Sequence, residues 1–544
     1  MKKILPLFLC LLSAFSLQAQ TFHFPDNYNT NFPDVDNPTF EEMNGEIYFF
    51  AAKNNFDYEP HKYSCATGAY TLLKDVNPGA ASSEPYTGVN EMMKFKTHVY
   101  FGALDGTGKT DLWRTDGTGA GTVKFKSFAF TSSNPQTISF FAADENLMYF
   151  RASTDAGYGI WRTDGTDAGT FLISQATNFN FYVSEKKYET LLYNGKFYFQ
   201  QKLLPAVTSL PYATDGTLAG TVCLIPAGNP DYYYMTDPYD FEPFQGKVWF
   251  GLDGPTNGGL FKSDGTLAGT QFMGSCGTGA NPGKRPNILK AAGDYLYVRA
   301  MGAQSGYELF YTDGTLNGGG LVSDLWPGPN SGLQSGSEFF AVGDKLFFTG
   351  APSAASSVKD LYVVTGTSAP IRLDISGPTQ DSKPQFLVSY NNLLYFRAKA
   401  TSNSIDQRVY QSDGTVAGTV DAAPGASYYF LGGTLQALPS GIYFPATIGG
   451  NDLRPATIGN CFMATGVSET IQHHIELFPN PIEGQLNFKG IDKSQKICVQ
   501  DLQGRKMLEK LISPGDGELD CSELPSGMYV VCFENGKREK VVRK

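Results

Sequence analysis

Short hydrophobic runs rich in aromatic residues recur along most of the chain, about fifty residues apart. Nine of them lie between Glu46 and Ala446 and read EIYFFA, HVYFGA, LMYFRA, KFYFQQ, KVWFGL, YLYVRA, KLFFTG, LLYFRA and GIYFPA. Turns rich in Gly and Asp separate the strand signals, and no helical periodicity connects them. The pattern predicts short antiparallel β-strands arranged as meanders.

A second motif, Asp-Gly-Thr, follows the aromatic runs with the same period. Its clearest copies are LWRTDGTGAGTV, IWRTDGTDAGTF, PYATDGTLAGTV, LFKSDGTLAGTQ, LFYTDGTLNGGG and VYQSDGTVAGTV. The Asp and Gly of these turns are Asp116 with Gly117, Asp164 with Gly165, Asp215 with Gly216, Asp264 with Gly265, Asp313 with Gly314, and Asp413 with Gly414. Weaker copies contain Thr67-Gly68, Thr365-Gly366 and Thr465-Gly466. Two independent markers that share one period identify a repeat.

Each repeat divides into four short strands. In the second unit we expect them at residues 88–96, 98–103, 110–115 and 122–128. A four-stranded unit with this period is typical of a propeller blade. The predicted fold is therefore an all-β propeller of about eight or nine four-stranded blades, followed by a small Ig-like β-sandwich. Residues 22–34 are a candidate strand for closing the ring with the last unit.

The Asp-Gly-Thr turns have a sufficient structural explanation. A tight turn needs a positive φ, which Gly accepts freely, and Asp and Thr side chains fasten turns by bonding nearby N–H groups. The second Gly of the motif is expected to let the next strand begin without a clash. The functional alternative is a ring of Asp-lined loops that binds calcium or sugar, although no D-x-D-x-D-G calcium loop occurs.

The repeats resemble the ELWxxDGTxxGT repeat proteins found among secreted proteins of Bacteroidota. Leu112-Trp113, Ile160-Trp161 and Leu309-Phe310 stand in the Leu-Trp position of that motif. The resemblance covers most of residues 40–470 and implies a propeller-like body, but it implies no reaction.

The two ends of the chain carry export signals. Lys2 and Lys3 precede an apolar run over residues 4–15 that is too short to span a bilayer, which indicates a secretory signal peptide cleaved near Ala19. We therefore divide the chain into a signal peptide (1–19), a propeller (20–466), a linker (467–474) and a C-terminal domain (475–544). We expect no transmembrane segment in the mature chain.

The C-terminal domain resembles the type A sorting domain of the type IX secretion system. The residues that carry the resemblance are Phe478, Pro479, Asn480, Pro481, Asp501, Gly504, Leu524, Pro525, Ser526, Gly527, Met528 and Tyr529. The resemblance implies recognition by the outer-membrane translocon and removal by a sortase-like peptidase, with residues 468–474 as the cleavage region. Anchoring to lipopolysaccharide or release would follow, so the expected location is the outer cell surface or the medium.

The charge of the chain limits the classes of partner that it can bind, and its cysteine content bears on metal sites and disulfides. The net charge is −11. The signal peptide is basic and the C-terminal domain is balanced, so the acidity lies in the body, which disfavours nucleic acid and simple docking on anionic lipid. Seven cysteines remain after signal removal, no C-x-x-C pair occurs, and buried free thiols are expected for most of them. We expect no cofactor and no metal.

No catalytic motif stands out. Residues 103–110 imitate a relaxed P-loop but lead into a strand, whereas a phosphate cradle requires a helix. The few histidines are His23, His61, His98, His473 and His474, and none is spaced as a metal pair. Arg114 and Arg162 occupy equivalent repeat positions, unlike the converging arginines of sialidases. The leading hypothesis is a protein- or glycan-binding adhesion module, and the alternatives are a glycan-active hydrolase or lyase at the channel, or a stalk or matrix protein.

Overall fold

The computed structural model divides the chain into two compact units, Met1–Gly466 and Val467–Lys544. The residues it describes are 39–52, 57–79, 81–84, 91–128, 138–154, 157–176, 190–202, 209–226, 236–253, 258–278, 283–334, 336–351, 359–377, 381–399, 407–424, 429–430, 435–447, 454–459, 476–478, 482, 484–491, 495–501, 505–512, 515–533 and 538–543. All regular elements in these ranges are β-strands. A helix capable of crossing a membrane is not found among them. The predicted signal peptide, the linker and the candidate closing strand at residues 22–34 lie outside these ranges.

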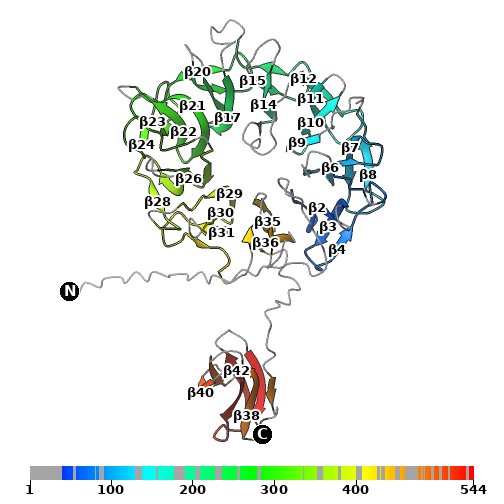
Figure 1. Cartoon of the computed structure of the whole chain (residues 1–544), viewed down its shortest axis with the longest axis vertical. Helices are drawn as coiled ribbons and strands as arrows, with labels where there is room; N and C mark the ends of the chain where they lie inside the picture. The colour runs from blue at the N-terminus through cyan, green and yellow to red at the C-terminus, as the bar shows by residue number, and fades with distance from the viewer. Residues whose placement is uncertain are drawn as a thin grey trace, which may run out of the picture. The chain divides into compact units, whose positions relative to one another are not determined.

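The described body contains nine antiparallel sheets, and in the first eight the strands are neighbours in their chain order (Figure 1). Sheet one contains β1 (Glu41–Met43), β2 (Glu46–Ala52), β3 (Tyr58–Ser64) and β4 (Tyr70–Leu72). Sheet two contains β5 (Met92–Phe95), β6 (His98–Leu104), β7 (Thr110–Thr115) and β8 (Val123–Lys126). Sheet three contains β9 (Ile138–Ala143), β10 (Met148–Thr154), β11 (Gly157–Thr163) and β12 (Phe171–Ala176). Sheet four contains β13 (Leu191–Tyr193), β14 (Lys196–Lys202), β15 (Ser209–Thr214) and β16 (Val222–Cys223).

The next four sheets repeat this arrangement. Sheet five contains β17 (Thr236–Phe244), β18 (Lys247–Asp253), β19 (Gly259–Ser263) and β20 (Gln271–Gly274). Sheet six contains β21 (Lys284–Ala292), β22 (Tyr295–Gly302), β23 (Gly306–Thr312) and β24 (Gly320–Ser323). Sheet seven contains β25 (Phe339–Val342), β26 (Lys345–Gly350), β27 (Asp360–Thr365) and β28 (Ile371–Leu373). Sheet eight contains β29 (Gln385–Tyr390), β30 (Leu393–Lys399), β31 (Gln407–Ser412) and β32 (Val420–Asp421).

The ninth sheet departs from the pattern. It contains β33 (Tyr429–Phe430), β34 (Gln436–Leu438), β35 (Gly441–Thr447) and β36 (Arg454–Gly459). Both β33 and β34 pair with the same edge of β35, so they act as one interrupted first strand. In the part of the chain that the structure describes, this sheet therefore has three strand positions rather than four.

The strand predictions for the second repeat hold closely in its centre. Strand β6 begins at His98 as expected and ends one residue later, and β7 matches its predicted range. The outer strand β8 begins at Val123 rather than Thr122, because the Thr122 hydroxyl is bonded to the Thr118 carbonyl and belongs to the turn. The first strand is shorter than expected and begins at Met92.

Hydrophobic clusters fill the interfaces between successive sheets. The second strands are buried along nearly their whole length, as in β6, because both faces of each sheet are covered. This explains why the aromatic runs are nearly continuous instead of alternating with polar residues. Full burial of one such side chain contributes about 1.5–3 kcal/mol. Nine interface clusters of this kind occur in the described body, one at each pair of neighbouring sheets.

Polar bonds between the first strands accompany this packing. The Glu91 carboxylate accepts the Phe140 N–H of the next sheet at 2.7 Å, and Glu242 accepts the Ala291 N–H at 3.0 Å. Figure 1 shows the sheets following one another around a ring, with fourth strands such as β8, β24 and β28 toward the outside.

The last sheet contacts the first in the same way, and we call this contact the seam. Phe40, Phe49 and Tyr63 pack with Tyr443 of the ninth sheet. The Phe40 N–H donates to Gln436 Oε1 at 2.6 Å, which repeats the bond between first strands seen elsewhere. The described residues of the body therefore form a closed series of contacts.

The C-terminal unit is two antiparallel sheets. One contains β37 (Glu476–Phe478), β38 (Gln485–Ile491) and β41 (Gly515–Asp520). The other contains β39 (Gln495–Gln500), β40 (Lys506–Ile512), β42 (Gly527–Phe533) and β43 (Arg538–Arg543). The buried core includes Ile497, Val499, Tyr529 and Val531. This unit therefore has a hydrophobic core made of its own residues.

Most cysteines among the described residues are free, as expected, but only Cys276 and Cys521 of the free ones are fully buried. Among the described residues, the free cysteines are Cys223, Cys276, Cys498 and Cys521. Cys65, which directly follows β3, is disulfide-bonded.

Candidate functional site

The Asp-Gly-Thr turns share one hydrogen-bonding pattern, shown here for sheet five. Asp264 Oδ1 accepts both the N–H and the hydroxyl of Thr266, at 3.0 and 2.7 Å. Thr266 Oγ1 in turn accepts the Gly269 N–H at 2.9 Å. The bonds from Thr266 hold the pKa of Asp264 below its usual range. The aspartates that share the bonding to the Thr two residues later are Asp116, Asp164, Asp215, Asp313 and Asp413.

The two glycines of the motif have different roles. The Gly that follows the Asp has a positive φ, for example +81° at Gly265, which agrees with the turn prediction. The second Gly was expected to let the next strand start, but the structure gives another reason. A Cβ at Gly269 would lie 2.1 Å from Asp264 Oδ1, so the carboxylate occupies the space of the missing side chain. The same contact recurs between Gly121 and Asp116.

Four of the six turns also bond back to a side chain of the preceding sheet, and we call this bond the latch. Lys196, in the first hairpin of sheet four, donates to the Gly265 carbonyl of sheet five at 2.9 Å. The bonds that join a first-hairpin side chain to an aspartate carbonyl 68 residues later are Lys96 to Asp164, Lys196 to Asp264, Gln245 to Asp313 and Lys345 to Asp413. Where sheet seven lacks the Asp, Tyr297 Oη donates to the Gly366 carbonyl at 2.6 Å.

The latch was missed from sequence, although its signal is visible there. A Lys or Gln lies 68 residues before four of the six aspartates. Searching for constant spacing across two repeats, rather than within one, would have found it. The turns predicted as repeat features are therefore contacts between sheets as well as turns.

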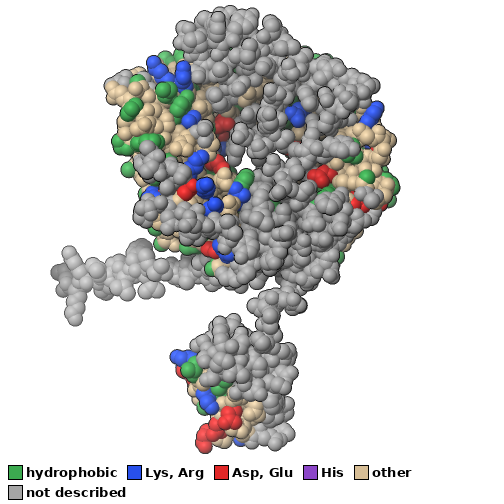
Figure 2. Space-filling view, in the orientation of Figure 1, with side chains coloured by type: hydrophobic (Ala, Val, Ile, Leu, Met, Phe, Trp, Pro, Cys, Tyr) green, Lys and Arg blue, Asp and Glu red, His purple; other side chains and the backbone are tan. Residues whose placement is uncertain are grey.

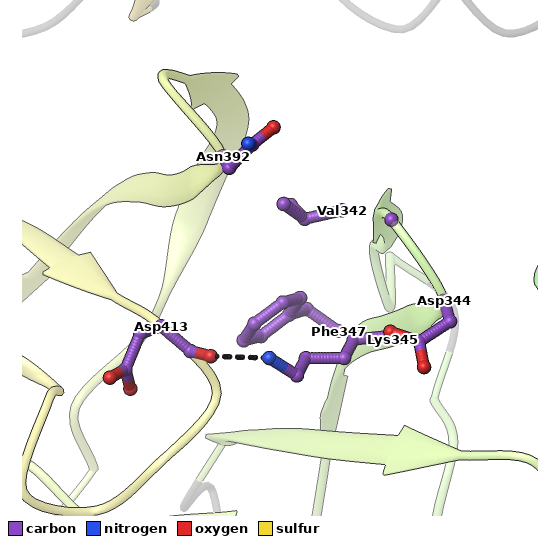
Figure 3. A pocket seen from close by; sticks show the side chains of 7 residues that line it. Val342, Asp344, Lys345, Phe347, Asn392 and Asp413 are labelled. Atoms are coloured by element: carbon purple, nitrogen blue, oxygen red, sulfur yellow. Dashed lines mark hydrogen bonds between the residues drawn. The ribbon is translucent and has the colours of Figure 1, made fainter. Parts of the chain in front are cut away.

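A small pocket lies beside one latch, between sheets seven and eight (Figure 3). Its volume is about 180 Å³, and it is lined by Val342, Gly343, Asp344, Lys345, Phe347, Asn392 and Asp413. Lys345 Nζ spans it and donates to the Asp413 carbonyl at 2.8 Å, as the dashed line shows. Because its only cation is already bonded in the latch, the pocket belongs to the frame that holds the sheets together. No group of three or more His, Cys, Asp or Glu in the described ranges is arranged to hold a metal ion.

Two buried glutamates occupy equivalent positions in the third strands of sheets one and six. Glu308 accepts the N–H groups of Leu325 and Gly332, and Glu59 accepts the N–H of Val76 at 2.8 Å. Burial raises the pKa of each carboxyl to about 7, although the N–H donors oppose this shift. Perturbed carboxyls are candidates for catalysis. These two, however, have no exposed surface and hold the chain that follows the fourth strand of their own sheet.

The glutamates give the body a specific pH dependence. The unfolding free energy of the mature protein should fall as pH rises from about 4.5 to about 7. The folded carboxyls bind protons more tightly than the unfolded ones, so their contribution is complete below pH 4.5 and is lost above pH 7. Each unit of pKa difference corresponds to about 1.4 kcal/mol. Denaturant unfolding across this range measures the slope.

Matched variants separate this effect from other carboxyls. Glu308→Gln removes one of these two groups and should make the slope shallower, whereas Glu509→Gln, on the surface of the C-terminal unit, should leave it unchanged. An unaltered slope in the first variant would contradict the assignment. The turn aspartates act in the opposite direction but at lower pH, because their pKa values are lowered.

The other candidate residues do not form a catalytic group. His61 is buried, its Nδ1 lies 2.8 Å from the Glu59 carbonyl, and burial lowers its pKa to about 4. The P-loop-like segment joins β6 to β7 as a hairpin, in which Asp105 accepts the Thr107 hydroxyl at 2.6 Å. Arg114 donates to the Gly165 carbonyl at 3.0 Å and so joins neighbouring sheets. His23, His473 and His474 lie outside the described residues.

The sorting residues divide between the core and the surface of the C-terminal unit. Leu524 and Tyr529 are buried, and the Tyr529 hydroxyl donates to the Pro525 carbonyl at 2.7 Å. Met528 is 55% exposed, and Pro525, Ser526 and Gly527 are exposed beside it. Asp501 accepts the Arg505 N–H across a turn at 2.9 Å. Phe478 ends β37, whereas Pro479, Asn480, Pro481 and Gly504 lie outside the described residues.

The two ends of the sheets differ in their connections. At one end, the Asp-Gly-Thr connection has a constant length, as in residues 116–122 and 413–419. At the other end, the connection between second and third strands varies from residues 155–156 to residues 351–359. We call these the turn end and the loop end. In Figure 2, basic and acidic side chains are both scattered over the coloured part of the visible surface.

Comparisons with known proteins identify the C-terminal unit. Residues 476–544 match the family model described as a secretion system C-terminal sorting domain. This match confirms the predicted sorting domain and indicates export to the outer cell surface or secretion. No curated protein matches the sequence significantly.

The chain also shows low similarity to solved structures, among them the following three. PorZ, a surface component of the type IX secretion system of Porphyromonas gingivalis, is 11% identical with a TM-score of 0.28, covering 96% of this chain and 100% of that one. The propeller domain of the Trilobed protease from Pyrococcus furiosus is 7% identical with a TM-score of 0.32, covering 78% and 94%. The Pyrococcus horikoshii acylaminoacyl peptidase is 9% identical with a TM-score of 0.34, covering 74% and 57%. At these TM-scores the similarities carry no argument about activity.

Proposed function

We propose that this chain is a type IX secretion cargo whose body is a nine-bladed β-propeller that binds an extracellular protein or glycan. The observation that carries this proposal is the difference between the two ends of the sheets. Connections of constant length are used as latches, and connections of variable length stand at the opposite end. Binding residues are disproportionately found on variable loops held by a rigid frame. The resemblance to ELWxxDGTxxGT repeat proteins supports the same architecture.

The loop end is therefore the proposed binding surface, and the ring of aspartates at the turn end is not. The Asp264 carboxylate is occupied by its own Thr266, and the Gly265 carbonyl by Lys196 of the preceding sheet. A calcium or sugar ligand at such a turn would have to compete with these bonds. The loop end offers unequal connections, as recognition of one particular ligand requires.

The enzyme alternative receives less support. The described carboxyls with strongly raised pKa values, Glu59 and Glu308, are equivalent to each other and are bonded to backbone N–H groups. A hydrolase needs unequal groups that converge on an accessible site. If the mature protein cleaved a bound glycan by hydrolysis or elimination, the hydrolase or lyase hypothesis would be favoured instead.

We further propose that the C-terminal unit is an Ig-like sandwich read by the outer-membrane translocon. A sortase-like peptidase would then cut within residues 468–474, leaving the body attached to lipopolysaccharide or free in the medium. The basis is the family match together with the independent core of this unit. Intact-mass analysis of protein from the cell surface and the medium reports the new terminus and any conjugate. Recovered protein that still carries Lys544 would rule out the cleavage.

Binding can be tested on a glycan array and against extracellular proteins, using labelled mature protein. Any ligand found is then measured with substitutions at the two ends. Gln304→Lys and Asn330→Lys alter the loop end, and Leu218→Lys and Leu316→Lys alter exposed residues of the turn end. We expect at least tenfold weaker binding, or about 1.4 kcal/mol, from a loop-end substitution and no change from the turn-end pair. The reverse result, or no ligand of either class, would overturn the proposal.

A further inference from the structure

One connection at the loop end departs from the repeat. The connection after β24 begins with DLWPG, whereas the corresponding segments of sheets one and eight read DVNPG and DAAPG. Trp326 thereby takes the place of Asn77 in sheet one and of Ala423 in sheet eight. The equivalence with sheet one is structural as well, because Glu308 and Glu59 each accept an N–H from the residue 17 positions further along. A residue that breaks the repeat on a surface connection is a candidate for recognition.

This connection, residues 324–334, is fixed to sheets six and seven. The Glu308 carboxylate accepts the N–H of Leu325 at 2.9 Å and also the N–H of Gly332. The Gly332 carbonyl in turn accepts the N–H of Ala351, which directly follows β26 of sheet seven, at 2.8 Å. A segment that is already fixed in the unbound protein loses little conformational entropy when it binds a ligand.

Trp326 differs from the other three tryptophans of the chain, which all lie in strands. Trp113 and Trp249 are only 6% and 1% exposed, and Trp161 packs against the cluster between sheets two and three. Trp326 is partly exposed and belongs to none of the clusters that fill the described body. Among the residues that the structure describes, its ring stacks on no other aromatic ring. Its indole is therefore not committed to the core.

The hairpin between β22 and β23 lies against this connection and adds polar groups. The Tyr307 N–H donates to Ser331 Oγ at 3.0 Å, which joins the hairpin to the connection. Gln304 of the hairpin and Asn330 of the connection are both exposed. The indole of Trp326 and two exposed side-chain amides therefore belong to one packed unit at the loop end.

The distribution of apolar surface favours a glycan over a protein as the ligand of this unit. In the described body, nine of the ten large hydrophobic side chains that are exposed lie in a fourth strand or in the connection that leads to it, and Met301 is the exception. The centre of a stable protein interface needs an apolar surface, which the described loop end lacks. A pyranose needs only an aromatic face for its C–H groups and a few polar groups for its hydroxyls.

We propose that Trp326 is the stacking platform of a glycan-binding site at the loop end of sheet six, and that it takes the apolar face of a pyranose ring. The amides of Asn330 and Gln304 bind the hydroxyl groups of the sugar. This inference rests on the proposed function, which places the ligand at the loop end, and narrows that ligand to a glycan. The bonds from Glu308 hold the connection in its binding conformation before the sugar arrives.

An array of neutral and acidic pyranose oligosaccharides, followed by titration of the tightest binder, tests the proposal on the mature protein. Trp326→Ala should weaken binding at least tenfold, and Trp326→Phe, which keeps an aromatic ring, should weaken it less. Leu218→Ala removes a side chain that is 68% exposed at the turn end and should leave binding unchanged. The tryptophan emission of the parent should change on titration, and Trp326→Phe should lose this change. If Trp326→Ala fails to fold, this comparison decides the question.

The outcomes separate this inference from the proposed function. An oligosaccharide that binds the parent and Trp326→Ala equally well would overturn the role of Trp326 and leave the proposed function standing. An empty array together with an extracellular protein that binds the loop end would have the same consequence. An empty array without any protein ligand would overturn both.

Discussion

A chain shortened to end before residue 476 should disappear from the cell surface and the medium and accumulate inside the cell. The removed residues are those matched by the sorting-domain family, and they form a separate compact unit with its own core. The body keeps all nine interface clusters, so it should fold without them. Immunoblots of medium, intact cells and periplasmic extract, with an epitope placed in the body, measure the distribution. We expect the extracellular fraction to fall to background.

Point variants show whether export requires the C-terminal unit to be folded, since they leave the length of the chain unchanged. Val531 is fully buried in the C-terminal core, whereas Leu511 is 62% exposed. Val531→Asp places an unpaired charge in that core and should block export as completely as the truncation. Leu511→Asp adds the same charge to the surface and should leave export largely intact. Normal extracellular amounts of the truncated chain would refute the assignment of the tail.

The repeating pattern predicted the second and third strands well, because each is fixed by residues close together in sequence. An aromatic run and an Asp-Gly turn define β6 and β7 within one residue. The first strands were harder, because Glu91 and Phe140 bond across sheets and the sequence within one repeat does not contain both partners. The interrupted first strand of sheet nine carries no such local signal.

The sequence explained only one of the two glycines in the turn motif, because the role of the other depends on a contact within the folded connection. Sequence reasoning explains the Gly after each Asp from φ alone, and the structure agrees at Gly265. It cannot show that the second Gly faces the carboxylate, since that contact depends on how the connection folds back on itself. The latches are likewise contacts between distant parts of the chain. The sorting tail was predictable because its residues form one continuous segment.

The second glycine of the motif leads to the largest stability effect that we expect within the body. A Cβ at Gly269 would stand 2.1 Å from Asp264 Oδ1, and the backbone there is not in the left-handed region. The clash alone must therefore displace the carboxylate and break its bonds to the Thr266 N–H and hydroxyl. Bonds to a charged group contribute about 1.5–3 kcal/mol. Gly269→Ala should lower the unfolding free energy by about 2–3 kcal/mol, measured as the denaturant midpoint of the mature protein.

A double-mutant cycle tests the stated cause rather than the size of the loss. Asp264→Ala removes the obstructing carboxylate together with its bonds, so adding Gly269→Ala to it should cost little more. The coupling between the two sites should then be about 1 kcal/mol or larger, as for residues in direct contact. Gly320→Ala is the matched control, because a Cβ there meets only Tyr311 at an ordinary 3.8 Å. Strictly additive losses at positions 264 and 269 would mean that the carboxylate does not fill the space beside this glycine, and the turn motif would need another explanation.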